Sequence, residues 1–112
     1  MAKRGPSKYD SYERDPAVAR WRANLSRGSP ITAEVSLRRL GKACELLKTT
    51  PKGLLELAEK DLKNLQNQLE DLVTELESEG KAPGYILGIL KAVKSWLRYN
   101  DIKLTRRIKP IR

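Results

Sequence analysis

The chain has 112 residues, of which 23 are Lys or Arg, 14 are Asp or Glu and none is His, so its net charge is +9. This length suits one domain with its own core, no apolar run is long enough to cross a membrane, and the lone cysteine, Cys44, cannot form an internal disulfide or a cysteine-rich zinc site. Because the absence of His also removes Ser-His and Cys-His catalysis from this chain, we expect a binding module without catalytic residues, metal or cofactor.

A polar segment precedes the first predicted helix. Residues 1–12 are basic and contain Gly, Pro and Ser, but no apolar stretch typical of a secretory signal, so we expect a flexible arm. Asp15 and Pro16 form an N-cap followed by proline at the first helical position, and Gly28 is suited to end that helix. The apolar residues between them share one helical face: Val18, Trp21 and Leu25.

A second helix begins directly afterwards. Ser29 and Pro30 repeat the cap pattern, and the sequence from Thr49 to Pro51 ends the helix. Thr50 and Pro51 can in turn cap a short helical turn that carries Leu54, Leu55 and Leu57. The apolar face of the second helix repeats at intervals of three and four residues: Ala33, Leu37, Leu40, Cys44 and Leu47.

Two further helices complete the predicted bundle. Residues 58–79 have the clearest helical period, with Gly80 closing the helix, and Pro83 opens a last helix that Asn100 can end in the left-handed conformation. We expect the two helices to pack on each other through five apolar residues: Leu65, Leu69, Leu72, Val93 and Trp96. Asp101 to Arg112 is a basic tail that reads as a short strand or an extended linker. The predicted fold is all-α, a small bundle of four main helices plus one short helical turn.

Charge is distributed unevenly along the chain. Residues 1–55 hold 12 cations and 5 anions, residues 56–79 hold 2 cations and 8 anions, and residues 80–112 hold 9 cations and 1 anion. The third helix is therefore acidic, and positive charge lies before and after it. This pattern favours an anionic partner on one side of the bundle.

Several cations recur at helical spacing away from the apolar faces. Lys91, Lys94 and Arg98 form a stripe on the last helix, and a second group on the second helix consists of Arg38, Arg39 and Lys42. Any single one of these could be an ordinary solvated side chain. Taken together with the tail cations, of which Arg106 and Arg107 are candidate contacts, they indicate nucleic-acid binding. We expect the first six to form one surface.

Other conspicuous residues have simpler interpretations. Trp21 and Trp96 lie on apolar faces and are expected in the core rather than stacked on bases, and Cys44 is expected as a small core residue. Tyr85 is open to three interpretations: core, rim or DNA contact. The acidic residues of the third helix are expected to form a solvated face rather than a metal site: Glu70, Asp71, Glu75 and Glu77.

Two stretches resemble a known family. SPITAEVSLRRLGKACELL, from Ser29 to Leu47, resembles the first helix of the core-binding domain of tyrosine recombinases (the phage integrase family), which commonly starts with Ser-Pro-x-Thr followed by Leu and basic residues. DLKNLQNQLEDLVTELESEGKAPGYILGILKAVKSWLRYNDIKL, from Asp61 to Leu104, is similar to the second half of that domain, and its end is most similar to archaeal or archaeal-virus integrases. The chain departs from the family at Ala82, where Ser or Thr is usual, and at Tyr85, where Thr is common.

The resemblance implies a SAM-like helical domain that clamps double-stranded DNA, spanning residues 13–104. Residues 105–112 would then link it to a covalently attached catalytic domain that this chain lacks. Because the corresponding two helices face DNA in the family, the resemblance adds Thr32 and Ser36 to the expected contacts. It also implies a cytoplasmic, nucleoid-associated protein without a membrane partner, with self-association on DNA as a further option. The alternatives are a helical protein-interaction module and a stand-alone accessory DNA-binding protein.

Overall fold

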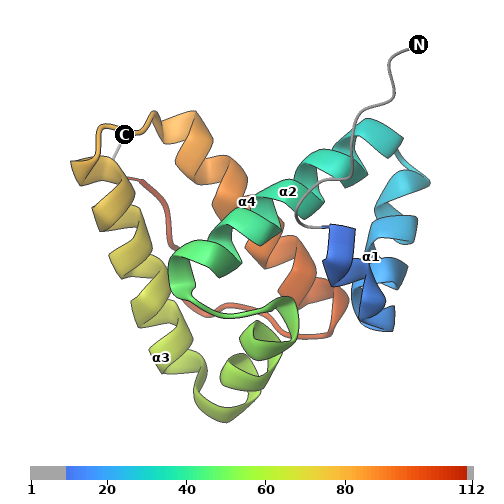
Figure 1. The fold of residues 1–112 in the computed structure, drawn as a ribbon. Coiled ribbons are helices and arrows are strands. Elements are labelled where there is room, and N and C mark those ends of the chain that lie inside the picture. The colour runs from blue at the N-terminus through green and yellow to red at the C-terminus, as the bar shows by residue number, and fades with distance from the viewer. Residues whose placement is uncertain (1–9, 111–112) are drawn as a thin grey trace.

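The computed structural model describes residues 10–110, and these form only helices, turns and irregular segments, with no strand among them (Figure 1). This confirms the predicted all-α class with four main helices. None of the described helices is both long and apolar enough to cross a membrane. The elements are a 3-10 helix and four α-helices: η1 (Asp10–Arg14), α1 (Pro16–Ser26), α2 (Pro30–Leu47), α3 (Pro51–Ser78) and α4 (Pro83–Tyr99).

The helix starts predicted after Asp15, Ser29 and Thr50 are confirmed by their caps. Each α-helix has proline in its first turn, and three of them have a side chain that accepts a backbone N–H there. Asp15 accepts from Ala17 at 2.9 Å, while Ser29 and Thr50 cap α2 and α3 in the same way. Ala82 precedes α4 without a side-chain cap, as expected for a residue that has no acceptor.

One predicted helix stop is wrong. Asn100 has φ of −99°, and the left-handed residue after α4 is its neighbour Asp101, with φ of 66°. Asn100 instead donates its side-chain amide to the carbonyl of Trp96 at 2.9 Å, which satisfies one of the free carbonyls at the helix end. Gly80 adopts φ of 81° after α3, as its predicted role requires.

The predicted short turn and third helix form one helical segment with a kink. Helical structure runs from Pro51 to Ser78 and is interrupted at Asp61, which has φ of −156° and ψ of 77°. The side chain of Asp61 accepts the backbone N–H of Asn64 at 3.1 Å, so it caps the second part of α3. The boundary therefore lies three residues after the predicted one, because Asp61 provides a cap and Ala58 does not.

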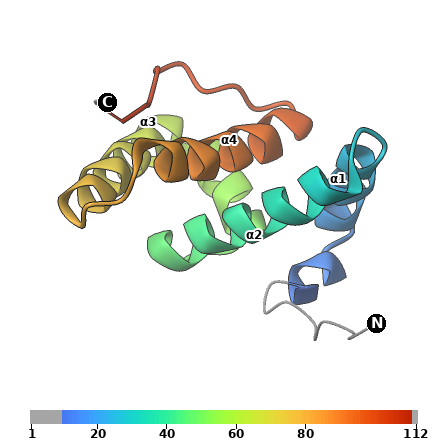
Figure 2. The ribbon, with the colours of Figure 1, turned by 90° about the horizontal axis from the view of Figure 1, so that it is seen from above.

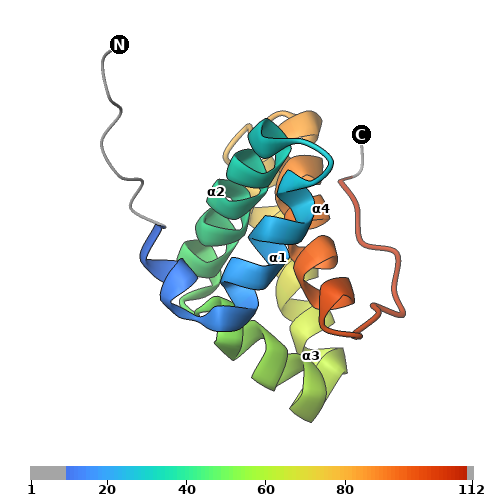
Figure 3. The ribbon, with the colours of Figure 1, turned by 90° about the vertical axis from the view of Figure 1, so that its right-hand side faces the viewer.

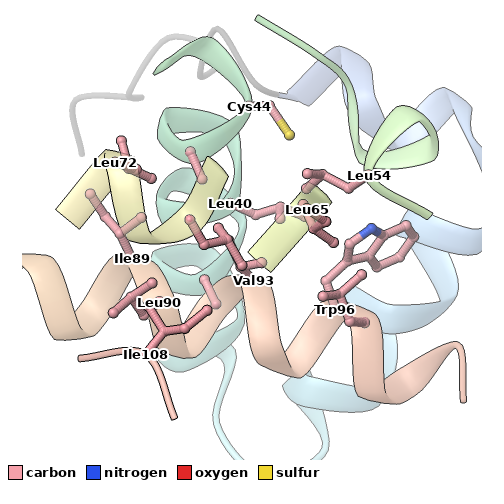
Figure 4. Packing of buried hydrophobic residues seen from close by; sticks show 14 of the residues in the cluster. Leu40, Cys44, Leu54, Leu65, Leu72, Ile89, Leu90, Val93, Trp96 and Ile108 are labelled. Atoms are coloured by element: carbon pink, nitrogen blue, oxygen red, sulfur yellow. The ribbon is translucent and has the colours of Figure 1, made fainter. Parts of the chain in front are cut away.

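The core lies where α2 and α4 cross, with α1 and α3 packed on either side (Figures 1 and 3). Trp21 and Trp96 are 1% and 0% exposed, and their rings meet edge to face at a centroid distance of 5.5 Å. The apolar residues predicted to join the third and last helices are all buried, and they pack beside Leu40, Leu54 and Ile89 (Figure 4). Both tryptophans are core residues, as predicted.

The described parts of both chain ends pack against the helices. Residues 1–9 of the predicted arm and residues 111–112 of the tail lie outside the described residues. The remainder of the arm begins η1, and Tyr12 packs against the core. The described part of the tail forms no strand, and it returns in an irregular conformation along α4 and α3, where Ile108 is 3% exposed (Figure 2).

Candidate nucleic-acid interface

A basic groove lies between α2 and the first half of α4. It has a volume of about 520 Å³ and contains three of the predicted cations beside three apolar or aromatic side chains. We call it the α2–α4 groove. Its lining residues are Val35, Arg38, Arg39, Lys42, Tyr85 and Ile89.

A second basic groove lies between α1 and the second half of α4, and it contains the other three predicted cations. Its volume is about 400 Å³. Its floor is fixed by a hydrogen bond of 3.1 Å from Trp21 Nε1 to Ser95 Oγ, which ties α1 to α4. We call it the α1–α4 groove. Its lining residues are Trp21, Asn24, Leu25, Lys91, Lys94, Ser95, Arg98 and Tyr99.

The structure thus divides the single predicted surface into two grooves. Arg39 reaches from α2 to α4, because its guanidinium lies against Gly88 of α4, where a Cβ atom would come within 2.7 Å of Arg39 Cζ. Gly88 is about one helical turn before Lys91 along α4, so Arg39 is the cation of the α2–α4 groove that contacts the α4 backbone in this part of the helix. Close approach of Arg39 to the α4 backbone depends on the missing side chain of Gly88.

Five of the six groove cations form no ion pair with a carboxylate in the described part of the chain. Among residues 10–110, no ion pair involves Arg38, Arg39, Lys91, Lys94 or Arg98. Lys42 approaches Glu45 at 3.9 Å, but both side chains are more than a third exposed, so the attraction is weak. No acidic side chain lines either groove in the described chain. Both grooves therefore present net positive charge.

Tyr85, Thr32 and Ser36 differ in their position relative to the grooves. Tyr85 is 39% exposed at the rim of the α2–α4 groove, with Lys81 Nζ 5.8 Å from its ring centroid. Thr32 is exposed in the first turn of α2, whereas Ser36 is half-buried. Neither Thr32 nor Ser36 lines a groove, so the family resemblance is the only reason to include them.

Tyr99 and Lys103 are two further residues of the basic grooves and hollows that were not predicted. Tyr99 is 36% exposed and lines the α1–α4 groove. Lys103 joins Lys94 and Arg98 around a smaller hollow of about 170 Å³. The sequence carries a signal for Tyr99, because it directly follows the basic stripe of the last helix. Lys103 has no such signal, since its place depends on how the tail folds back.

The tail cations lie apart from both grooves. Arg106 Nη1 is 3.0 Å from Glu70 Oε1 and 2.6 Å from Asn67 Oδ1, so its charge is directed at α3. Arg107 lines a different hollow of about 230 Å³ that also contains Glu70 and Glu77. The acidic face of α3 is therefore partly covered by the tail and is not simply solvated. Arg106 is a structural residue here rather than a free cation.

The chemistry of the remaining candidates is limited. No group of three or more potential metal ligands occurs within residues 10–110. Cys44 is buried, as predicted, and burial raises the pKa of its thiol to about 12 because the thiolate would lose its hydration. A neutral thiol is a poor nucleophile. Cys44 therefore belongs to the core and not to a reactive site.

Comparison of the whole chain with protein-family models, with characterised proteins and with solved structures finds no match.

Proposed function

We propose that this chain binds double-stranded DNA through the two basic grooves and positions it without carrying out chemistry. The observation that supports this proposal is the arrangement of six cations in two grooves along α4 whose linings contain no acidic side chain in the described chain. Lys and Arg side chains that neutralise phosphates release counterions and provide most of the affinity of such complexes. These contacts fix position and do not read sequence.

The family resemblance gives this proposal its biological setting. A core-binding domain of a tyrosine recombinase is a small helical bundle that grips DNA, while a separate domain carries the catalytic residues. We therefore propose that this chain serves as the DNA-binding part of a site-specific recombinase, in the cytoplasm and associated with the nucleoid. The absence of cleavage or covalent attachment to DNA by this chain remains a prediction.

A helical protein-interaction module is the rival function, and the exposed apolar residues argue against it. Within the described chain, only four large apolar or aromatic residues are at least 36% exposed. Two of these, Tyr85 and Tyr99, lie in the basic grooves rather than in an apolar patch. Protein-binding surfaces usually have a contiguous apolar centre. The surface charge therefore favours a polyanion.

Fluorescence anisotropy with a labelled duplex tests the proposal. Two triple variants each remove one groove's cations: one combines Arg38→Ala, Arg39→Ala and Lys42→Ala, and the other combines Lys91→Ala, Lys94→Ala and Arg98→Ala. The matched control combines Lys52→Ala, Lys60→Ala and Lys63→Ala, which removes the same charge from exposed positions on α3 outside both grooves.

We expect each groove variant to lose at least tenfold in affinity, since three phosphate contacts disappear, and the control to lose much less. Equal losses in all three variants would show that net charge alone attracts DNA. No loss in either groove variant would contradict the proposed surface.

A further inference from the structure

Each basic groove contains one half-exposed tyrosine in addition to its three cations. Tyr85 stands with Arg38, Arg39 and Lys42, and Tyr99 stands with Lys91, Lys94 and Arg98. These two residues are 39% and 36% exposed, while both tryptophans are buried. The two exposed aromatic rings of the described chain thus each lie beside three cations.

The grooves also offer more apolar surface than a phosphate needs. Val35 in the α2–α4 groove and Leu25 in the α1–α4 groove are half-buried and offer apolar surface beside the cations, while Ile89 and Trp21 line the same grooves at only 1% exposure. Their volumes of about 520 and 400 Å³ lie in the range of pockets that hold small organic ligands. A purely electrostatic contact would leave these apolar walls exposed to water.

From these observations we infer that each groove binds an unpaired nucleotide, with the base stacked on the tyrosine ring and the phosphates held by the three cations. Proteins that bind single-stranded nucleic acid combine a positive groove with stacking aromatic side chains in this way. The inference rests on the proposed DNA binding and specifies its substrate as DNA with unpaired bases, such as a gapped or frayed duplex.

Two other occupants fit the grooves less well. Bases within an intact duplex are already stacked on their neighbours, so their faces are not available to Tyr85 or Tyr99. An acidic peptide would satisfy the cations, but its carboxylates have no flat surface to cover the tyrosine rings. An unpaired nucleotide matches both the charge and the aromatic surface.

The test compares two labelled strands of twelve nucleotides that carry the same phosphates. One strand is oligothymidine, and the other has abasic residues throughout. We expect the parent protein to bind oligothymidine about tenfold more tightly than the abasic strand, because stacking adds to the phosphate contacts. Tyr85→Leu and Tyr99→Leu together should remove most of this difference, while the dependence of affinity on salt stays unchanged because no charge is lost.

Leu87→Ala provides the matched control, since Leu87 is 38% exposed on α4 but lines neither groove. It should leave both affinities unchanged, and thermal melts of all variants verify that the fold is intact. Equal binding of the two strands, or an unaltered preference in the double tyrosine variant, would overturn the inference while leaving duplex binding in place. Displacement by polyglutamate as effective as by oligothymidine would also overturn it, and failure to bind any DNA would reject the proposed function itself.

Discussion

Trp96 connects residues that are far apart in the chain. Its ring is fully buried against Trp21, and its indole N–H donates to the carbonyl of Pro51 at 2.9 Å. The single side chain thus joins α4 to α1 and to the start of α3. Such a residue combines the energy of apolar burial with a buried hydrogen bond, so its removal affects packing and polar satisfaction together.

We expect Trp96→Ala to lower the free energy of unfolding by about 3–5 kcal/mol, because it leaves a large cavity. Trp96→Phe keeps much of the ring volume but leaves the Pro51 carbonyl without its donor, so it should cost about 1–3 kcal/mol. Urea denaturation followed by circular dichroism measures both values. A loss below about 1 kcal/mol for Trp96→Ala would contradict the buried position.

Cys44 makes stability depend on pH in the alkaline range. Burial raises its pKa from 9.0 to about 12 in the folded protein, so the unfolded chain releases the thiol proton first. The stabilising contribution is therefore complete below pH 9 and is lost as the pH rises toward 12. Cys44→Ala should show a shallower loss of stability over this interval than the parent.

Alkylation by iodoacetamide at pH 8 provides an independent measurement of the same property. We expect Cys44 to react slowly in the folded protein and rapidly in urea, since only the thiolate attacks. Rapid modification of the native protein would mean that the thiol is accessible.

At the scale of elements, Gln66 fastens the tail to α3. Its side chain is 3% exposed, and its Oε1 accepts hydrogen bonds from Thr105 N at 2.7 Å, Thr105 Oγ1 at 3.2 Å and Arg106 N at 2.9 Å. We expect Gln66→Ala to destabilise the fold by about 1–3 kcal/mol, because it removes a buried acceptor. Hydrogen exchange should then become fast at the Thr105 and Arg106 amides.

Arg106→Ala is the comparison for that prediction. Its ion pair with Glu70 is between side chains that are 32% and 49% exposed, so its loss should cost at most about 1 kcal/mol. If Arg106→Ala destabilises the protein more than Gln66→Ala, the tail is held by charge and not by the Gln66 side chain.

Gly88 leaves room for the guanidinium of Arg39 against α4. A Cβ atom there would displace the guanidinium of Arg39, which is the flexible end of a side chain and can move at small cost. Alanine is also a better helix former than glycine by about 1 kcal/mol. We therefore expect Gly88→Ala to keep or slightly raise thermal stability while weakening DNA binding. Unchanged DNA binding would show that the position of Arg39 is not important.

Local sequence signals predicted the elements better than their long-range contacts. Proline after Asp, Ser or Thr marks three of the helix starts, because the cap and the first turn are close in sequence. The kink at Asp61 was missed, since the predicted boundary relied on apolar period rather than on a cap within the acidic segment. The docked tail was missed because only Gln66, a polar residue at a buried position of α3, could have indicated it.

The residues of the candidate site were likewise predictable where local spacing determines them, and not where contacts between distant segments do. Helical spacing identified six cations that line the grooves, because spacing determines which side chains share a face. Helical spacing could not show that these cations lie in two separate grooves on α4. It also could not show that Arg106 donates hydrogen bonds to Glu70 and Asn67. Both facts depend on contacts between segments that are distant in sequence.

For the whole molecule, the net charge of +9 predicts attraction to DNA, but the placement of the charges predicts which of them release counterions. If about six phosphates are neutralised, the logarithm of the binding constant should fall with the logarithm of salt concentration at a slope near −5. Lys91→Gln should reduce that slope by about one. Arg106→Gln removes the same charge but should leave the slope unchanged, because Arg106 contacts Glu70 and lies away from the grooves. Salt titrations of the two variants beside the parent separate a localised interface from diffuse attraction. A slope that falls by the same amount in both variants would place the tail on the DNA.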